Sequence, residues 1–540
     1  MYKIINGRVY DPVHGIDGER KTIYIKDGSI VEGPFEGAEV IDAQGMVVMP
    51  GGVEVHSHIA GPKVNVGRQM CPEDHYVGVE PRTDITRAGC GQVVPTTYVT
   101  GYRYARMGYT TAFEAATPPL EARHVHEELN DIPMLDKGCY VLMGNNHFVL
   151  RAIKNGDRQG LKDYIAWLLL ATKGYAIKVV NPGGVVNWKL NGNATTLDEE
   201  AKGYGVTPRE IVSHLVQANE ELGLPHPVHI HCNNLGQPGN YRTTLETLKE
   251  VEGQRMHLTH LQFHSYGASK RGRIVSKAPE IAEYLNTHPK ITADAGQVVF
   301  GPVTTMTADG ALQHQLHLMT GSKWGNTDIE METGSGVVPM MYKKSSLANS
   351  VQWAIGLELL LTVENPWQIF LTTDHPNAGP FTAYPSIIKL LMDRDYREEM
   401  LSQMNKKTSK YTTLAGIKRE YTLSEIAVIT RSGPARVLGL KKKGHLGAGA
   451  DADVAIYPML EDKEEMFANP TYVFKGGKLV VRSGKIIEQV FGATHYVDAP
   501  WNKDLLERIA DDFQRFYTVS MSNYPVQPEY LPVSEVVSCS

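Results

Sequence analysis

Met49-Pro50-Gly51-Gly52-Val53-Glu54-Val55-His56-Ser57-His58 is the stretch that decides the fold, and it predicts a short β-strand leaving a Gly-Gly turn. The β-branched Val53 and Val55 alternate with other residues, as is typical of a strand. Because alternate side chains of a strand share a face, His56 and His58 point to the same side. Two neutral imidazoles on one face can hold one metal ion, since each offers a nitrogen lone pair.

Seven further apolar stretches have the character of short buried strands. They are residues 110–115, 138–143, 175–180, 227–231, 255–260, 290–294 and 368–374. Helical segments lie between several of them, for example at 161–172, 208–222 and 276–287. Eight strands in β/α alternation predict an α/β fold, a (β/α)8 TIM-like barrel, in which the chemistry sits at the carboxyl ends of the strands.

The two ends of the chain have a different sequence pattern, in which short strands of alternating apolar and polar residues are separated by glycine turns. Residues 2–9, 22–31 and 39–48 have it near the start, and 453–457, 471–475 and 478–486 have it near the end. Each group is too small to stand alone, so we expect one small β-sandwich domain formed from both chain ends. The predicted division is 1–50 and 431–497 for the composite β-domain, 51–430 for the barrel and 498–540 for a tail.

Two segments fall outside this scheme. Residues 300–349 are too long for an ordinary connection and predict either a lid or a subunit contact. The tail has apolar side chains at helical spacing, which favour a helix packed on its own barrel, with docking on a partner as the alternative. These side chains are Leu505, Leu506, Ile509, Phe513 and Phe516.

The composition narrows the class of protein. The 540 residues carry 54 Lys and Arg against 60 Asp and Glu, a net charge of −6 that gives no electrostatic case for nucleic acid or a membrane surface. Five scattered cysteines without a CxxC pair argue for a reducing compartment and against an iron–sulfur cluster. Met1 leads directly into a strand and the apolar runs are short, so we expect a cytoplasmic protein without a signal peptide or membrane span.

Polar residues that could bind metal stand within or at the ends of the predicted strands. Lys178 lies between two apolar residues, where a charged ammonium is costly unless it is paired or chemically changed. It could reach solvent or pair with a carboxylate, or it could react with CO2 to form a carbamate. His231, His260 and Asp374 end later strands, while His229 competes with His231 and both His257 and His264 compete with His260.

This set of residues resembles the signature of the binuclear amidohydrolases. Lys443-Gly444-His445-Leu446-Gly447 and the following Asp451-Ala452-Asp453-Val454 are similar to the family's return strand. Residues 52–63, 228–236 and 370–381 resemble the hydrolase-like subunit of formylmethanofuran dehydrogenases and its counterpart in bacterial formyltransferase/hydrolase complexes. Glu54 departs from the wider family, where many members carry Asp, and it need not be a ligand.

The resemblance implies two divalent metal ions, zinc being the best match to mixed nitrogen and oxygen ligands. His56, His58 and Asp374 would hold one ion, His231 and His260 the other, and carboxylated Lys178 would bridge them. Asp374 would act as base and then acid while a formyl amide is hydrolysed. In reverse, the same site would condense formate with the amine of methanofuran or a similar one-carbon carrier, as in methanogenesis.

The resemblance also implies partner subunits, namely a molybdenum or tungsten subunit that produces formate and a small β-rich subunit. Several polar residues that follow strands are candidates for substrate binding: His147, Asn233, Asn234, Gln297 and Asn377. Two alternatives stay open. One is a free-standing cyclic amidohydrolase of the dihydropyrimidinase or dihydroorotase type, and the other is a non-enzymatic barrel scaffold, which the six filled ligand positions disfavour.

Overall fold

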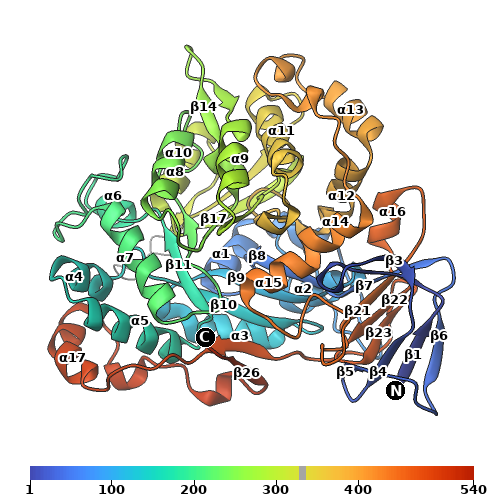
Figure 1. Cartoon of the computed structure of the whole chain (residues 1–540). Helices are drawn as coiled ribbons and strands as arrows, with labels where there is room; N and C mark the ends of the chain where they lie inside the picture. Colours follow the sequence, from blue (N-terminus) through green and yellow to red (C-terminus); the bar gives the residue numbers. More distant parts are fainter. Residues whose placement is uncertain (327–335, 540) are drawn as a thin grey trace.

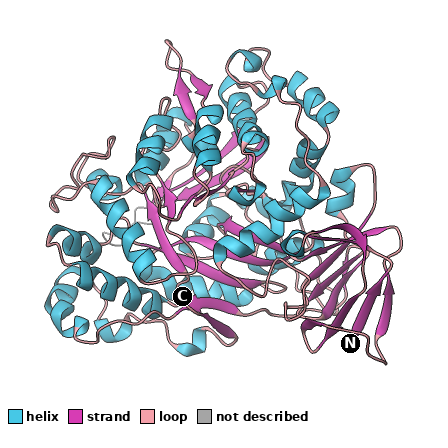
Figure 2. Ribbon diagram, viewed as in Figure 1, coloured by secondary structure: helices cyan, strands magenta, loops and turns pink. Residues whose placement is uncertain are grey.

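A barrel of eight parallel strands forms the centre of the molecule, in a computed structural model that describes residues 1–326 and 336–539 (Figure 1). Helices surround the strands on the outside (Figure 2). In barrel order the strands are β8 (Gly52–Ser57), β9 (Tyr109–Thr117), β10 (Asp136–Leu142), β11 (Ala176–Val180), β12 (His229–His231), β13 (Met256–Leu258), β16 (Ile291–Asp294) and β20 (Ile369–Phe370). Each overlaps one of the eight predicted strands, so the predicted fold class is confirmed.

The barrel closes where its first and last strands meet. Ser57 at the end of β8 forms a parallel bridge with His375, which follows β20. The backbone N–H of His58 donates to the carbonyl oxygen of His375 at 2.7 Å. This closure is what brings the two histidines of β8 next to Asp374, although more than 300 residues separate them in the sequence.

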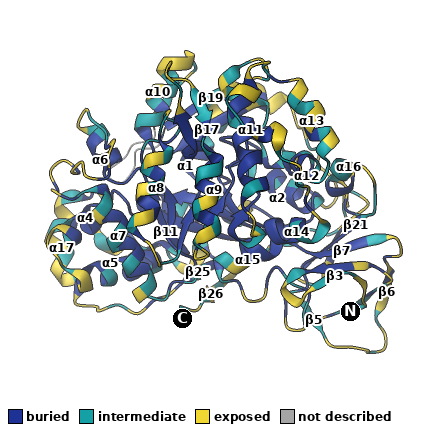
Figure 3. Cartoon of the chain, turned by 45° about the horizontal axis from the view of Figure 1, so that its top comes forward, coloured by how far each residue is buried: buried dark blue, intermediate teal, exposed yellow. Residues whose placement is uncertain are grey.

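Helices connect the barrel strands and cover them. The larger ones are α3 (Ala122–Asp131), α5 (Arg158–Thr172), α7 (Pro208–Glu221), α8 (Tyr241–Glu250), α9 (Ala278–Thr287), α11 (Leu347–Thr362) and α12 (Tyr384–Met392). The segments α5, α7 and α9 match the three predicted helices. The helix α7 starts with a capping box, because Thr207 accepts from the N–H of Glu210 while Glu210 accepts from the N–H of Thr207. The exposed residues of these helices face outward (Figure 3).

Shorter elements complete the barrel region. They are α1 (Pro62–Met70), α2 (Thr97–Arg106), α4 (His147–Lys154), α6 (Gly184–Lys189), β14 (Tyr266–Ala268), β15 (Ile274–Ser276), α13 (Arg394–Ser402), α14 (Leu423–Ala427), α15 (Gly433–Leu438) and α16 (Lys463–Ala468). The helix α15 lies directly after a π-helical turn and packs against β8 and β20.

The two chain ends form one β-domain, as predicted from their sequence pattern. Its seven-stranded sheet has the order β24-β23-β22-β21-β7-β2-β3, and its four-stranded sheet the order β5-β4-β1-β6. At the centre, β7 (Met46–Pro50) pairs antiparallel with β21 (Val454–Pro458). Buried side chains of both sheets, such as Ile4, Ile25 and Val48, share one core. The other strands are β1 (Tyr2–Ile5), β2 (Arg8–Asp11), β3 (Ile16–Arg20), β4 (Ile23–Lys26), β5 (Ser29–Val31), β6 (Glu39–Asp42), β22 (Tyr472–Lys475), β23 (Lys478–Arg482) and β24 (Lys485–Ile486).

The long segment after β16 forms a small antiparallel sheet and a helix. The sheet has the order β17-β19-β18, from β17 (Gly301–Thr307), β19 (Gly336–Tyr342) and β18 (Gly325–Asn326), and α10 (Gly310–Thr320) follows β17. Residues 327–335 of the predicted lid segment lie outside the described residues. The described part lies over the carboxyl ends of the barrel strands, so it is placed to cover a site there.

The tail packs on its own barrel, as its helical spacing favoured. In α17 (Leu505–Phe516), Phe513 lies 6.0 Å from Phe148 of α4 and 6.3 Å from Trp167 of α5, measured between ring centroids. Strands β25 (Thr494–Val497) and β26 (Ser534–Val537) extend the sheet from β10 in parallel. Of the helices described, none has the length and apolar character needed to cross a membrane.

Candidate active site

His56 and His58 emerge side by side from the end of β8. The side chains of Val53 and Val55 are buried and hold the strand in place. Glu54 does not face the cavity, because its Oε1 accepts from the N–H of His56 at 2.9 Å and its Oε2 accepts from the Tyr384 hydroxyl. Burial raises the pKa of Glu54 to about 8. Glu54 thus holds the backbone of His56 in place through a hydrogen bond inside the barrel.

Asp374 lies between the two histidines. Its Oδ1 is 2.7 Å from Nε2 of His56 and 3.3 Å from Nε2 of His58. Its Oδ2 accepts from Nδ2 of Asn377 at 2.9 Å, which fixes the plane of the carboxyl group. One carboxylate oxygen and two imidazole nitrogens therefore converge on one point.

Lys178 on β11 is buried, and its Nζ has no hydrogen-bond partner among the described residues. Leaving an ammonium group in this state costs several kcal/mol, about as much as breaking a buried ion pair. Burial lowers the pKa of Lys178 to about 7, so much of the amine is neutral at neutral pH. A neutral amine facing a cavity is the form that can react with CO2, and its carbamate would supply oxygen ligands.

His231 ends β12 and His260 follows β13 by two residues, and the two rings lie 4.8 Å apart, measured between centroids. Nε2 of His231 is 3.4 Å from Oδ2 of Asp309, which precedes α10. His260 has a left-handed backbone with φ of 36°, and its N–H donates to Oδ1 of Asp294 at 2.9 Å. No hydrogen-bond partner for Nδ1 of His260 occurs in the described part of the chain.

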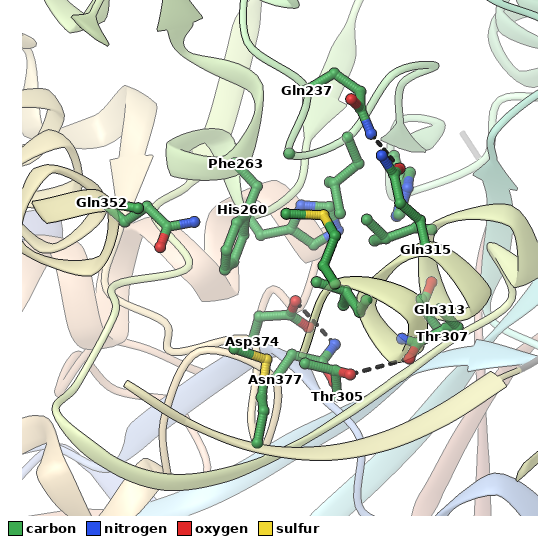
Figure 4. Close-up of a pocket in the computed structure, with 18 of the residues that line it drawn as sticks. Gln237, His260, Phe263, Thr305, Thr307, Gln313, Gln315, Gln352, Asp374 and Asn377 are labelled. Atoms are coloured by element: carbon green, nitrogen blue, oxygen red, sulfur yellow. Dashed lines mark hydrogen bonds between the residues drawn. The ribbon is translucent and has the colours of Figure 1, made fainter. Parts of the chain in front are cut away.

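All six predicted ligands line one cavity of about 600 Å³ at the carboxyl ends of the barrel strands. They are His56, His58, Lys178, His231, His260 and Asp374. Figure 4 labels two of them, His260 and Asp374, among other residues of the lining. Apolar side chains such as Leu235, Phe263 and Leu312 form much of the remaining wall. Thr305 of β17 and Gln313 of α10 also line it and are joined by a 3.0 Å hydrogen bond. The segment after β16 therefore forms one wall of the cavity.

The predicted substrate-binding residues separate into two groups. Asn377 lines the cavity beside Asp374. The others do not line it. His147 lies 2.8 Å from the Tyr204 hydroxyl and packs on Phe516 of the tail. The three amides hydrogen-bond within the protein: Asn233 to Asn181, Asn234 to the carbonyl of Thr195 and Gln297 to the carbonyls of Val298 and Trp353.

The competing histidines lie off the cavity. His229 sits deeper in the barrel, with its Nε2 2.8 Å from Nδ1 of His56. His257 has its Nε2 3.1 Å from Oδ2 of Asp294. His264 is buried behind His231 and His260, with its ring centroid 5.5 Å from that of His231 and 5.3 Å from that of His260. This geometry favours His231 and His260 as the residues that face a ligand.

Glu114 and Lys63 support His58, and sequence reasoning did not single them out. Oε1 of Glu114 lies 3.3 Å from Nδ1 of His58 and accepts from Nζ of Lys63 at 2.9 Å. Burial opposes ionisation of Glu114, but Lys63 and His58 hold its pKa below the usual range. The signal was present in the sequence, because Glu114 is a charged residue inside an apolar strand, as Lys178 is.

The donor atoms fit a metal centre. His56, His58 and Asp374 present three ligand atoms within 4.8 Å of one another, all on buried residues. His231, His260 and Lys178 face the same cavity and add two imidazoles and a reactive amine. Imidazole nitrogens with carboxylate oxygens are a ligand set that suits divalent ions such as zinc. The site therefore has the donors for hydrolytic metal chemistry.

Comparisons with known proteins agree with this fold and site. Residues 39–487 match the model of the amidohydrolase family. The chain is 50% identical to protein FwdA of Methanocaldococcus jannaschii, over 98% of this chain and 97% of FwdA. It is 40% identical to one component of the formyltransferase/hydrolase complex Fhc of Methylorubrum extorquens, over the whole of both chains.

A crystal structure of the formyltransferase/hydrolase complex FhcABCD of Methylorubrum extorquens with methylofuran contains a chain that superimposes with a TM-score of 0.94. That chain is 38% identical, and the match covers 100% of both chains. The chain therefore belongs to the amidohydrolase family, in the group that includes FwdA and this component of the Fhc complex.

Proposed function

We propose that this protein is a binuclear metal amidohydrolase subunit that reversibly joins formate to the amine of methanofuran, or of a similar furan-bearing carrier. The products of this direction are the N-formyl carrier and water. The observation that carries the proposal is the Nζ of Lys178, which has no hydrogen-bond partner in the described ranges 1–326 and 336–539 and faces one cavity together with four imidazoles and Asp374. Similarity over the full length to a component of a formyltransferase/hydrolase complex supports the choice of a formyl amide.

His56, His58 and Asp374 would hold one divalent ion, and His231 with His260 would hold the second. Lys178, converted to a carbamate, would add oxygen ligands to this set. We propose zinc for both positions, because four imidazoles dominate the donor set. When bound, such ions would supply an activated water molecule and a Lewis acid for the formyl carbonyl.

The side chains of this protein carry the proton transfers. The Asp374 carboxylate is oriented by its hydrogen bond from Asn377. It takes a proton from the attacking water and returns it to the leaving amine nitrogen. The carbon–nitrogen bond of the formyl amide breaks, and formate and the carrier amine are released. In the condensation direction Asp374 takes a proton from the ammonium of the carrier, and the amine nitrogen then bonds to the formate carbon. One oxygen of formate leaves as water with the two protons that the nitrogen loses.

The cavity wall limits access of bulk water. Leu235, Phe263 and Leu312 are apolar, and the segment containing β17 and α10 covers the site. Joining an ionised carboxylate to an amine is unfavourable in open water, so the reaction needs such an enclosure and a local supply of formate. We infer partner subunits in a cytoplasmic complex, among them a molybdenum or tungsten subunit that produces formate and a small β-rich subunit. The methylofuran-containing FhcABCD complex of the relative supports this assembly.

The decisive experiment compares formyl transfer with ring-amide hydrolysis. The purified protein, alone and within its native complex, is given N-formylmethylofuran, hydantoin or dihydroorotate after its metal content has been measured. We expect two metal ions per chain. We also expect the protein to hydrolyse only the N-formyl carrier, with release of formate, and neither of the two cyclic amides. Hydrolysis of a cyclic amide at a higher kcat/KM would favour the free-standing cyclic amidohydrolase. A metal-free chain that turns over none of them would favour the scaffold.

A further inference from the structure

Three buried histidines form a continuous chain from a helix end to the cavity. Nδ1 of His226 lies 3.0 Å from the carbonyl oxygen of Val437. Nε2 of His226 lies 3.0 Å from Nδ1 of His229. Nε2 of His229 lies 2.8 Å from Nδ1 of His56. Val437 is near the end of α15, where the last carbonyls have no partner within the helix.

These contacts determine which nitrogen of each ring carries the proton. A carbonyl oxygen only accepts, so Nδ1 of His226 must carry the N–H. A neutral imidazole has one N–H, so Nε2 of His226 accepts from the N–H at Nδ1 of His229. By the same step, His229 accepts through Nε2 from the N–H at Nδ1 of His56. The remaining nitrogen, Nε2 of His56, is left with a free lone pair.

The other groups around these rings are consistent with this assignment. The Thr259 hydroxyl also lies within hydrogen-bond distance of Nδ1 of His56 and can accept from the same N–H. Oδ2 of Asp294 is 3.8 Å from Nδ1 of His56 and 3.9 Å from Nε2 of His229. It is closer to Nε2 of His257, at 3.1 Å, and takes its hydrogen bond there.

The lone pair of His56 faces a second acceptor. Nε2 of His56 is 2.7 Å from Oδ1 of Asp374, and both atoms are then acceptors. Two acceptors this close repel each other unless a cation lies beside both. We propose that His226 and His229 are positioning residues that fix the tautomer of His56 from the carbonyl of Val437, so that its Nε2 is held ready for a metal ion. This inference rests on the metal site of the proposed function.

Burial supports the neutral form of the relay, which is the hydrogen-bonded pair His226 and His229. His226 and His229 are fully buried and His56 is 1% exposed. Desolvation lowers the pKa of His226 well below the ordinary value. Tyr140 stacks on the ring of His226 at 5.1 Å and contacts His229, which holds both rings in the barrel interior. The relay lies on the far side of His56 from the cavity, so it acts on the site without touching substrate.

The test is a matched pair of substitutions at His226 in the full chain. In His226→Gln, the amide can donate to Val437 and its oxygen can accept from His229, so the polarity of the relay is kept. In His226→Phe, the ring still stacks on Tyr140 but offers no acceptor. The readout is the rate of zinc release to a chromophoric chelator, with metal content and thermal unfolding measured in parallel. We expect release to be about 10- to 100-fold faster for His226→Phe and close to wild type for His226→Gln.

The outcomes separate the relay from the metal site itself. If wild-type protein binds zinc, the metal site stands. The relay is then overturned by an unchanged rate of zinc release in folded His226→Phe, or by an equally accelerated release in both variants. Failure of the wild-type protein to bind zinc would instead overturn the proposed function. If His226→Phe does not fold, ring-15N NMR of wild type against His226→Gln identifies the His226 signals. The Nδ1–H tautomer supports the relay, and the Nε2–H tautomer or an imidazolium refutes it.

Discussion

Nδ1 of His58 and Oε1 of Glu114 lie 3.3 Å apart, so the second histidine of the site is held by a carboxylate while the first is held by another histidine. Glu114 is buried together with Lys63, and its Oε2 also accepts from the N–H of Ile59 and of Ala60. A carboxylate behind a metal-binding imidazole orients the ring and raises its basicity. Glu114 therefore serves the site and the fold at the same time.

Substitution of Glu114 by Gln should weaken metal binding by about 10- to 100-fold, because the amide cannot supply the negative charge behind His58. The same change leaves Lys63 buried without its counter-charge, which should destabilise the protein by about 3 to 5 kcal/mol. Equilibrium dialysis against zinc and urea unfolding measure the two effects. The control is the double variant Glu114→Gln with Lys63→Met, which should recover much of the stability and none of the metal affinity. Full stability of the single variant would contradict the ion-pair argument.

Asp374→Asn should leave metal largely bound while formyl hydrolysis falls by about 10²- to 10⁴-fold, the usual contribution of general acid–base catalysis. The amide keeps the size of the side chain but cannot accept a proton. Formate release and metal content per chain are the measurements. Tyr76→Ser, at a side chain that is 87% exposed and does not line the cavity, serves as the control. Near-normal turnover by Asp374→Asn would remove Asp374 from the proton-transfer role.

Activation of metal-free protein by bicarbonate and zinc should depend on pH through Lys178. Only the neutral amine reacts with CO2, and its pKa is lowered to about 7. At a fixed concentration of dissolved CO2, the activation rate should therefore rise about tenfold per pH unit below 7 and level off above about pH 8. Stopped assays after mixing at each pH give this profile. Lys178→Arg keeps a cation but cannot form a carbamate, so it should show no bicarbonate-dependent activation, and activation of this variant would refute the carbamate.

Stability should fall as the pH is lowered through the range set by His126. This ring is buried, its Nε2 lies 2.9 Å from the carbonyl oxygen of Thr172, and desolvation lowers its pKa from 6.5 to about 4. Because the unfolded chain binds the proton first, the free energy of unfolding should decrease from about pH 6.5 to pH 4, by on the order of 3 kcal/mol. Urea unfolding of wild type against His126→Gln measures this. An equal pH dependence in both proteins would show that His126 does not carry it.

The barrel could be predicted from the sequence because each buried strand is an apolar run of its own, and several of these runs carry a candidate metal ligand within them or at their end. Lys178, His231, His260 and Asp374 belong to such runs and do meet at one cavity. The residues behind them could not be predicted. The contact of Glu114 with His58 depends on the register of β9 against β8, and the contact of His229 with His56 crosses the barrel interior between β12 and β8, which do not pair.

The predicted substrate-binding residues show a second limit of sequence reasoning. Alternation of side chains fixes direction within a strand but not in the loop that follows. Asn233 and Gln297 follow strands, yet both turn to hydrogen-bond within the protein, whereas Asn377 turns to the cavity. The wall formed by β17 and α10 could be recognised only as an unusually long connection, because its contacts with the barrel mouth are non-local.

The pairing of β7 with β21 has a consequence for how the protein is made. Strand β7 ends at Pro50 and its partner begins at Val454, so about 400 residues must be synthesised before the pair can form. At typical translation rates of 5 to 20 residues per second, this takes about 20 to 80 s. During that interval the N-terminal strands leave the ribosome with their apolar faces uncovered, and a chaperone that shields residues 1–50 would suit this order of synthesis.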